Sequence, residues 1–306
     1  MGFTARSPGA TVPFWISPPI LRLRLAMMAI PRQHRNNAGR TKPGVIGVAV
    51  LLLVLLSGCT LMSTDRQISY GLAHFKMGLN GQAIPPLVSA AAALERENPA
   101  DPRLVDVLIA LGTMAMSEKR YDFADNYFAG ALKAAEGLQP PDPVRLRNAL
   151  VNLGMYSLTR QRLQEAVPLL TRASTLSEKF EKREFHAIDL DNLASAYQSL
   201  KQIGRANELQ STALRVVNDV TDESMLARTK GTILHNLAAT YEELGQDAEA
   251  EQTFKSALAV LISGGTSVEP WRVETARRSW AKFLRKKGRE KEAQAIEARA
   301  VEPVAR

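Results

Sequence analysis

The sequence predicts an all-α fold, a solenoid of about six helix-turn-helix repeats and therefore about twelve helices. A unit centred on Leu237 recurs along the chain at intervals of 40 to 44 residues. The six equivalent anchor positions are Tyr70, Leu111, Leu153, Leu193, Leu237 and Trp280. Self-similarity with a period of this size is typical of repeat architectures, and no stretch of the chain shows the pattern of a strand. We therefore expect each unit to bury its apolar face against the next unit.

Small residues mark the same places in every unit. Those directly after the anchors are Gly71, Gly112, Gly154, Ala194, Ala238 and Ala281. Those 13 positions after the anchors are Ala83, Ala124, Ala166, Ala206, Ala250 and Ala293. Those 20 positions after the anchors are Ala90, Ala131, Ala173, Ala213, Ala257 and Ala300. Because small side chains let two helices approach closely, these positions are predicted to form the contacts within each hairpin.

A bulky apolar residue stands 17 positions after the anchor in four units, as Leu87, Phe128, Leu170 and Phe254, whereas Gln210 and Glu297 break the rule. This pattern resembles the tetratricopeptide repeat, in which bulky residues fill the holes left by small ones. The period of about 42 residues, with Asn-Leu before the small residue, resembles the repeats of kinesin light chains. The resemblance covers about residues 67–300 and implies a right-handed α-solenoid, followed by a tail at residues 301–306.

Each unit is expected to contain two helices that begin after a capping residue or a proline. Asp101-Pro102 and Glu269-Pro270 place proline at the first helical position, where a missing N–H is not needed. The first helices are predicted at 68–77, 105–117, 147–159, 187–200, 231–244 and 274–286. The second helices are predicted at 83–94, 123–135, 165–176, 206–217, 248–261 and 291–300.

Two prolines, Pro85 and Pro86, fall close to the start of the second helix of the first unit, and Pro168 takes the Pro85 slot in the third unit. Proline is tolerated in the first turn of a helix, because the first four backbone N–H groups have no partner within the helix. We therefore expect the helix that carries Pro85 to begin only two or three residues before that proline, at about Ala83.

The first 58 residues are predicted to be a leader that ends in a lipoprotein signal peptide. Translation from Met27 or Met28 would give a conventional basic stretch before the apolar run, and the alternative is that residues 1–26 form a cytoplasmic tail. The run 45–56 contains only Val, Ile, Leu, Ala and Gly. Its length suits the hydrophobic region of a signal peptide better than a membrane span of about 20 residues.

The apolar run ends in Leu56-Ser57-Gly58-Cys59, which resembles the lipobox of bacterial lipoproteins. The resemblance implies cleavage before Cys59 and attachment of lipid to its thiol. Since Cys59 is the only cysteine, an internal disulfide is excluded. Residues 59–66 would then be a short lipid-anchored tether, and Thr60, rather than Asp, favours the outer membrane with the solenoid facing the periplasm. The alternative is an uncleaved anchor, because the uncharged interval 43–64 is long enough to span a bilayer.

The net charge of +8 does not indicate a nucleic-acid partner. Residues 1–58 hold seven basic and no acidic residues, which leaves 32 basic and 31 acidic residues in the rest of the chain. A nucleic-acid-binding domain is expected to carry a clustered basic surface, and a nearly neutral repeat region gives no such signal.

The sequence offers no constellation of catalytic or metal-ligating residues. The motifs HExxH, GxxxxGK and GxSxG are absent, as is any pair of cysteines. His74, His186 and His235 lie in separate units without a second ligand at helical spacing, so each is interpreted as a surface or packing residue. We therefore expect a protein that is not an enzyme, with no cofactor, no metal and no small-molecule substrate.

Asparagine directly precedes the anchor leucine in three central units, at Asn152, Asn192 and Asn236. In tetratricopeptide arrays this position of the first helix lines the concave groove. An amide there can hydrogen-bond the backbone of an extended peptide, because it offers both donors and an acceptor. The alternative is that each amide bridges neighbouring repeats as a structural bond.

Other groove positions change character along the chain. The apolar set is Ile109, Met116, Val151 and Met155, which would suit an amphipathic partner or would pack beneath a neighbouring loop. The polar set is Gln198, His235 and Glu242, and the last unit follows with Arg278, Lys282 and Arg285. This gradient predicts an oriented protein or peptide partner, and charges of an ordinary solvated helix face are the alternative.

We expect a lipid-anchored scaffold or adaptor of the bacterial cell envelope, serving, for example, the assembly of an envelope, pilus or secretion complex. The alternative is an accessory or co-chaperone-like protein held in the inner membrane by an uncleaved signal anchor. The sixth unit carries Glu297 at the bulky position and is predicted to cap the solenoid, because a terminal repeat presents one face to water.

Overall fold

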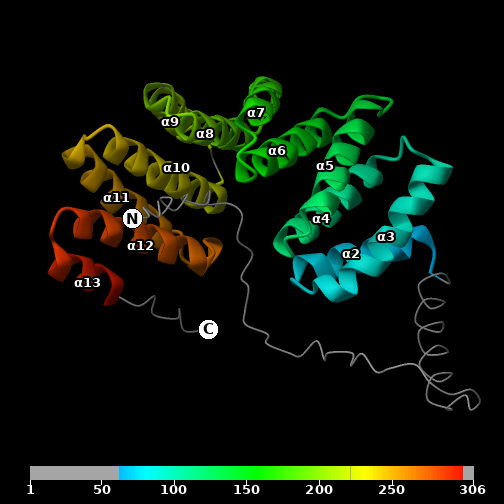
Figure 1. The fold of residues 1–306 in the computed structure, drawn as a ribbon, viewed down its shortest axis with the longest axis horizontal. Coiled ribbons are helices and arrows are strands. Elements are labelled where there is room, and N and C mark those ends of the chain that lie inside the picture. Colours follow the sequence, from blue (N-terminus) through cyan, green and yellow to red (C-terminus); the bar gives the residue numbers. More distant parts are fainter. Residues whose placement is uncertain (1–61, 221, 299–306) are drawn as a thin grey trace, which may run out of the picture. The chain divides into compact units, whose positions relative to one another are not determined.

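The computed structural model describes residues 62–220 and 222–298. These residues form twelve α-helices and no strand, so the predicted all-α repeat architecture is confirmed. The predictions for the leader, for Cys59 and for the C-terminal tail concern residues outside the described part. The helices divide into two compact units, residues 62–139 and the described part of 140–298, and each is treated by itself (Figure 1).

The first unit contains two hairpins. Their helices are α2 Thr64–Lys76, α3 Asn80–Glu97, α4 Pro102–Ser117 and α5 Tyr121–Glu136. The second unit contains four hairpins and a short 3₁₀ turn. Its elements are α6 Pro143–Thr159, α7 Leu163–Ser177, α8 Arg183–Ser199, α9 Ile203–Val217, α10 Glu223–Glu243, α11 Asp247–Ser263, η1 Gly265–Ser267, α12 Pro270–Lys286 and α13 Glu290–Ala298.

Two features of the helix boundaries differ from the prediction. Helix α3 begins at Asn80, so Pro85 and Pro86 lie beyond the first turn rather than within it. Pro86 is buried and Pro85 is exposed, and neither proline can donate a backbone hydrogen bond within the helix. Helix α10 begins at Glu223, eight residues before the predicted start at Gly231. The inserted residues between the fourth and fifth hairpins therefore extend a helix instead of forming a loop.

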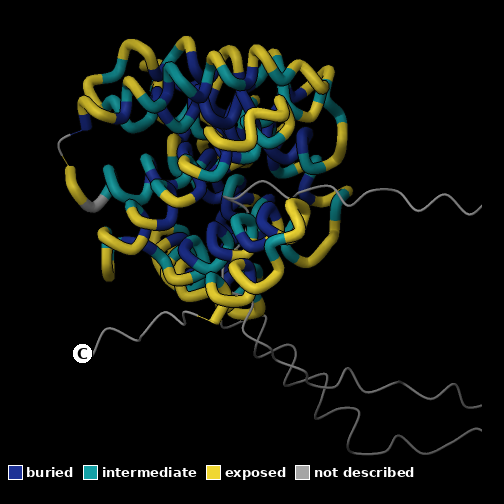
Figure 2. Tube along the Cα trace, turned by 90° about the vertical axis from the view of Figure 1, so that its left-hand side faces the viewer, coloured by how far each residue is buried: buried dark blue, intermediate teal, exposed yellow. Residues whose placement is uncertain are grey.

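The small and bulky positions of the repeat meet inside each hairpin. A Cβ added to Gly71 would lie 2.5 Å from Cγ of Leu87, and one added to Gly154 would lie 2.9 Å from Cγ of Leu170. At Gly112 the nearest atom of the Phe128 ring would be 2.7 Å away. The buried residues follow these contacts between the helices, and the turns are mostly exposed (Figure 2). The repeat pattern in the sequence therefore records the close approach of paired helices.

The turn within each hairpin contains a residue with positive φ, eight positions after the anchor. Three of these residues are glycines with φ between 73° and 77°, namely Gly78, Gly245 and Gly288. The other three have side chains and a φ of 60°, namely Lys119, Gln161 and Lys201. The left-handed conformation costs little for glycine and more for residues with a Cβ.

A buried ion pair links the third and fourth hairpins. Nε of Arg147 on α6 donates a hydrogen bond of 2.9 Å to Oδ2 of Asp189 on α8, and Nη2 donates to Oδ1. The guanidinium carbon also lies 4.9 Å from the ring centroid of Phe185. Both charged groups are almost completely buried, so each depends on the other for its stabilisation.

The helices of the described residues are all too short or too polar to serve as membrane spans.

Candidate peptide-binding surface

The apolar groove positions of the first compact unit, residues 62–139, lie on α4. Ile109 and Met116 are both partly buried, and the intervening Thr113 donates its hydroxyl to the Ile109 carbonyl at 2.9 Å. A partly buried isoleucine and methionine leave some apolar surface available for contact. The predicted role of these two residues in binding stays a prediction.

The apolar groove positions of the second compact unit, which begins at residue 140, are more deeply buried. Val151 is 8% exposed and Met155 is fully buried. In the described structure both side chains pack inside the unit and present little surface to a partner. Packing, the alternative that the sequence left open, accounts for their burial.

The three asparagines occupy three different environments. Asn152 donates from Nδ2 to the carbonyl of Asn148 at 2.8 Å, within its own helix. Asn192 is 6% exposed. Asn236 donates to Oδ2 of Asp191 at 2.7 Å, which joins α10 to α8. The amide of Asn236 thus has the geometry of a structural bridge, whereas the amide of Asn152 makes no bridge to another hairpin.

The partner of Asn236, Asp191, is a buried carboxyl group without an adjacent cation. Burial raises its pKa to about 7, and the side-chain amides of Asn236 and Gln210 act in the opposite direction. Oδ1 of Asp191 has no hydrogen-bond partner among the described residues. Gln210 on α9 is fully buried, and its amide acts on the pKa of Asp191 from nearby, but neither of its polar atoms has hydrogen-bond geometry to a partner among the described residues. The centre of the fourth hairpin is therefore polar and incompletely hydrogen-bonded.

His235 precedes Asn236 and is buried beside an aromatic residue. Its ring centroid lies 6.2 Å from that of Phe254, and its Nδ1 is 3.2 Å from Oδ1 of Asn236. Burial lowers the pKa of His235 to about 4, against the effect of the hydrogen bond to Asn236. The imidazole is therefore neutral at pH 7.

The remaining polar groove positions connect successive hairpins. Gln198 on α8 donates to Oε1 of Glu243 at 2.7 Å, and Lys201 lies 3.2 Å from the same carboxylate. Glu242 on α10 accepts from Nζ of Lys286 on α12 at 2.9 Å. These side chains hold neighbouring first helices together along one edge of the surface.

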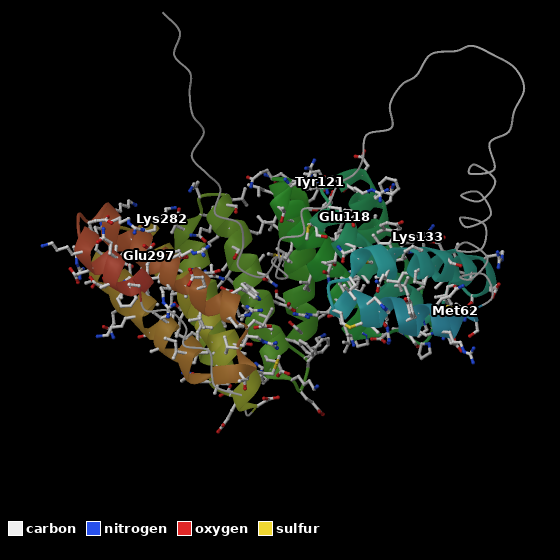
Figure 3. The ribbon with its side chains drawn as sticks, turned by 90° about the horizontal axis from the view of Figure 1, so that it is seen from below. Met62, Glu118, Tyr121, Lys133, Lys282 and Glu297 are labelled. Carbon is white, nitrogen blue, oxygen red and sulfur yellow. The ribbon has the colours of Figure 1, made fainter. Side chains whose placement is uncertain are left out.

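The basic residues of α12 are largely neutralised by neighbouring carboxylates. Arg278 donates to Glu274 at 2.7 Å, and Arg285 donates from Nη1 to Glu297 at 2.8 Å. Lys282, labelled in Figure 3, is exposed on the same helix. Paired charges fit the solvated-face interpretation of this end better than a basic site for an oriented partner.

No group of three or more potential metal-ligating side chains occurs within the described residues.

Comparison with known proteins agrees with the repeat pattern. Residues 231–262, which hold most of α10 and all but the last residue of α11, match the model of the tetratricopeptide repeat. The α10–α11 hairpin is therefore a tetratricopeptide repeat. No curated protein shows a significant sequence match.

Solved structures share this tetratricopeptide-repeat fold at low sequence identity. BtubC (BKLC) from P. vanneervenii is 19% identical with a TM-score of 0.57, over 80% of this chain and 96% of that one. A putative kinesin light chain from Podosopora anserina is 17% identical with a TM-score of 0.54, over 66% and 96%. A Rap protein in complex with Competence and Sporulation Factor is 13% identical with a TM-score of 0.53, over 77% and 74%. The comparisons indicate no enzymatic family.

The polar elements of the tetratricopeptide-repeat hairpins were the part that sequence reasoning missed. Arg147 and Asp189 are 42 residues apart, two more than the 40-residue step between their anchors Leu153 and Leu193, so their opposite charges near one repeat were a usable signal. Asp191 and Gln210 occupy the positions that hold Val151 and Leu170 in the preceding hairpin. Comparing equivalent positions in pairs would have revealed this replacement.

Proposed function

We propose that this tetratricopeptide-repeat protein is a lipid-anchored scaffold or adaptor that binds a protein or peptide partner on its first helices. The observation that carries the proposal is the run of asparagines at one repeat position on α6, α8 and α10. An amide can bond the backbone of an extended partner whatever its side chains are. The Rap structure, in which a similar fold is complexed with Competence and Sporulation Factor, supports a ligand-binding use of the fold.

The three asparagines contribute unequally in this proposal. Asn152 makes only a bond within its own helix, so its amide can exchange that bond for one to a partner. Asn236 bridges to a buried carboxylate, so removing its amide also costs stability. Removing the amide of Asn152 should therefore weaken partner affinity without changing stability, whereas removing the amide of Asn236 should change both.

The binding test uses a partner captured by crosslinking in intact envelopes and then purified. Asn152→Ala should weaken the affinity by roughly 1 to 3 kcal/mol while the melting temperature stays unchanged. Asn126→Ala, an exposed asparagine on α5, is the matched control and should change neither quantity. A loss of melting temperature without any loss of affinity at Asn152 would contradict the binding role.

The lipid anchor in this proposal rests on the apolar run 45–56 and on the tetrapeptide that ends in Cys59. Mass spectrometry of the mature protein should find a chain that begins at a lipid-modified Cys59. Cys59→Ser should leave the precursor uncleaved and without lipid. An intact leader in the wild-type protein would instead support the uncleaved inner-membrane anchor and the accessory or co-chaperone-like role.

The pathway would be the assembly of an envelope, pilus or secretion complex, with the solenoid facing the periplasm from the outer membrane. Fractionation of the envelope tests the location, because inner-membrane and outer-membrane vesicles separate by density. Recovery of the protein with the inner membrane would contradict outer-membrane sorting and leave the binding proposal standing.

A further inference from the structure

A stripe of side chains along α2 has no helix packed over it within the first unit. The stripe consists of Met62, Arg66, Ser69, Tyr70, Ala73 and Met77. The spacing of three and four residues places Arg66, Ser69, Tyr70, Ala73 and Met77 on one face of the helix, and Met62 lies just before the N-cap residue Ser63. Tyr70 is 44% exposed and Met77 is 61% exposed. The buried residues of the helix, Gln67, Ile68 and Gly71, lie on other faces.

The second hairpin shows what normally covers this face. The residues of α4 that lie 41 positions after Arg66, Ser69, Tyr70 and Ala73 are Val107, Ala110, Leu111 and Met114. All four are buried, and α4 packs against α2 and α3. The stripe on α2 is therefore the face on which a preceding hairpin would pack, and three of its side chains remain large and apolar.

The last hairpin also has an outer face that no further described hairpin covers, and there the exposed residues are polar. The exposed positions of α13 include Glu290, Lys291, Glu292 and Gln294. A terminal repeat needs such a polar outer face to stay soluble. The stripe on α2, with Tyr70, Met77 and Met62, is instead suited to contact with an apolar or interfacial surface.

We propose that the stripe on α2 lies on the bilayer surface and contacts the headgroup region of an anionic membrane. The inference rests on the membrane attachment in the proposed function. Only two residues separate Cys59 from Met62, so the stripe starts within about 11 Å of the attachment point at roughly 3.5 Å per residue. An uncleaved anchor within the uncharged interval 43–64 would lead directly into α2, so both forms of attachment bring α2 to the membrane.

The chemistry of the stripe fits this surface. Tyrosine is amphipathic and is enriched at membrane interfaces. Arg66 and Lys76 supply positive charge on α2 for anionic headgroups. The one acidic residue of the helix, Asp65, forms an ion pair with Arg103 on α4 and so adds little negative charge to this face.

The test uses full-length, lipid-modified protein in vesicles that contain anionic phospholipid. Because the lipid consumes the thiol of Cys59, a cysteine introduced by Tyr70→Cys or Met77→Cys is the only free thiol in the chain. Each variant is labelled with an environment-sensitive fluorophore. The matched control is Lys133→Cys on α5. Lys133 is exposed, and Figure 3 marks its position and that of Met62 by name.

Labels at positions 70 and 77 should shift to shorter emission wavelengths in vesicles and lose fluorescence to a quencher attached to the lipid chains. The label at position 133 should do neither. Equal behaviour at all three positions would overturn the inference. Arg66→Glu with Lys76→Glu should reduce the quenching at position 77, and high salt should reduce it in the parent protein.

Two further outcomes are distinguishable from this one. Disulfide-linked dimers of Met77→Cys, formed as readily in detergent as in vesicles, would assign the stripe to a second copy of the chain and overturn membrane contact. Mass spectrometry of the same samples reports lipid on Cys59. If lipid is absent, the proposed anchor fails, and the labelling is repeated with Cys59→Ser present, where quenching at position 77 decides the membrane contact separately.

Discussion

The third and fourth hairpins use the same two positions in opposite ways. In the third hairpin the pair is Val151 and Leu170, both apolar and buried. In the fourth hairpin the pair is Asp191 and Gln210, which are polar and equally buried. Both hairpins keep the same helix-turn-helix structure. The difference teaches that the small alanines of the repeat maintain the fold, while the inner pair can be exchanged for a pair with other chemistry.

The fourth hairpin also shows two ways of burying a carboxylate on one helix. Asp189 receives two hydrogen bonds from Arg147, whereas Asp191 receives a hydrogen bond from the amide of Asn236 at Oδ2. Burial of a charge is tolerated when a paired ion and hydrogen bonds replace water. The two aspartates should therefore respond oppositely when their charges are removed.

The largest effect should follow from breaking the buried ion pair. Arg147→Met leaves Asp189 as an uncompensated buried charge, which should lower the free energy of unfolding by about 3 to 5 kcal/mol. Denaturant titration at pH 7 measures this loss. The double variant Arg147→Met with Asp189→Leu should recover most of it, and failure of the double variant to recover would show that the pair has a role beyond charge compensation.

The next largest effect should be a pH-dependent increase in the free energy of unfolding caused by Asp191→Asn. The pKa of Asp191 is raised to about 7 in the folded protein, so its stabilising form is the protonated one, present below the unfolded pKa and lost as pH rises through 7. The stability of the variant relative to wild type should therefore increase by roughly 2 to 4 kcal/mol between pH 4 and pH 8. Denaturation curves across that range measure the difference. A difference independent of pH would contradict the raised pKa.

His235 provides the opposite pH dependence. Its pKa is lowered to about 4 in the folded protein, so its contribution is present above pH 6.5 and is lost as pH falls towards 4. In the wild-type protein the pH dependences of stability that come from Asp191 and His235 partly cancel. Asp191→Asn should therefore reveal an acid-side loss of stability that His235→Gln removes, as measured by the same denaturation curves.

Transplanting the inner pair of the third hairpin into the fourth tests the comparison directly. Asp191→Val with Gln210→Leu removes Oδ1 of Asp191 and the Gln210 amide, which lack hydrogen-bond partners among the described residues, together with the bond from Asn236 to Oδ2 of Asp191. The change should raise the free energy of unfolding by about 1 to 3 kcal/mol at pH 7, because an unsatisfied buried polar atom costs about that much. Partner binding measured alongside decides whether the polar pair has a second role. A destabilised double variant would show that the fourth hairpin is shaped around its polar pair.

The smallest effect should come from the exposed pair that joins α10 to α12. Lys286→Ala removes the ion pair with Glu242 and should cost less than about 1 kcal/mol, since exposed pairs are screened by water and salt. Thermal melts at low and high salt should show the difference only at low salt. A larger loss that persists at high salt would indicate that the edge of the surface is held mainly by this contact.

The repeat architecture could be predicted from the sequence because close helix packing leaves a direct signature. Gly71 and Gly154 sit where Leu87 and Leu170 contact the backbone, so spacing alone locates the hairpins. The environment of Asn236 could not be predicted in the same way. Its hydrogen bond to Asp191 depends on a residue 45 positions earlier and on the burial of both, which no local pattern reports.

The residues with positive φ in the hairpin turns have a consequence for how this protein could be made more durable. Lys119, Gln161 and Lys201 hold a conformation in which Gly78, Gly245 and Gly288 are unstrained. Replacing each of the three with glycine should relieve backbone strain, offset in part by the greater freedom of glycine in the unfolded chain. Because the three turns are one repeat or more apart, their effects should add. The turns at Lys119 and Gln161 are thus independent points at which ageing, storage life or resistance to proteolysis could be adjusted, whereas Lys201→Gly would also remove the ion pair with Glu243.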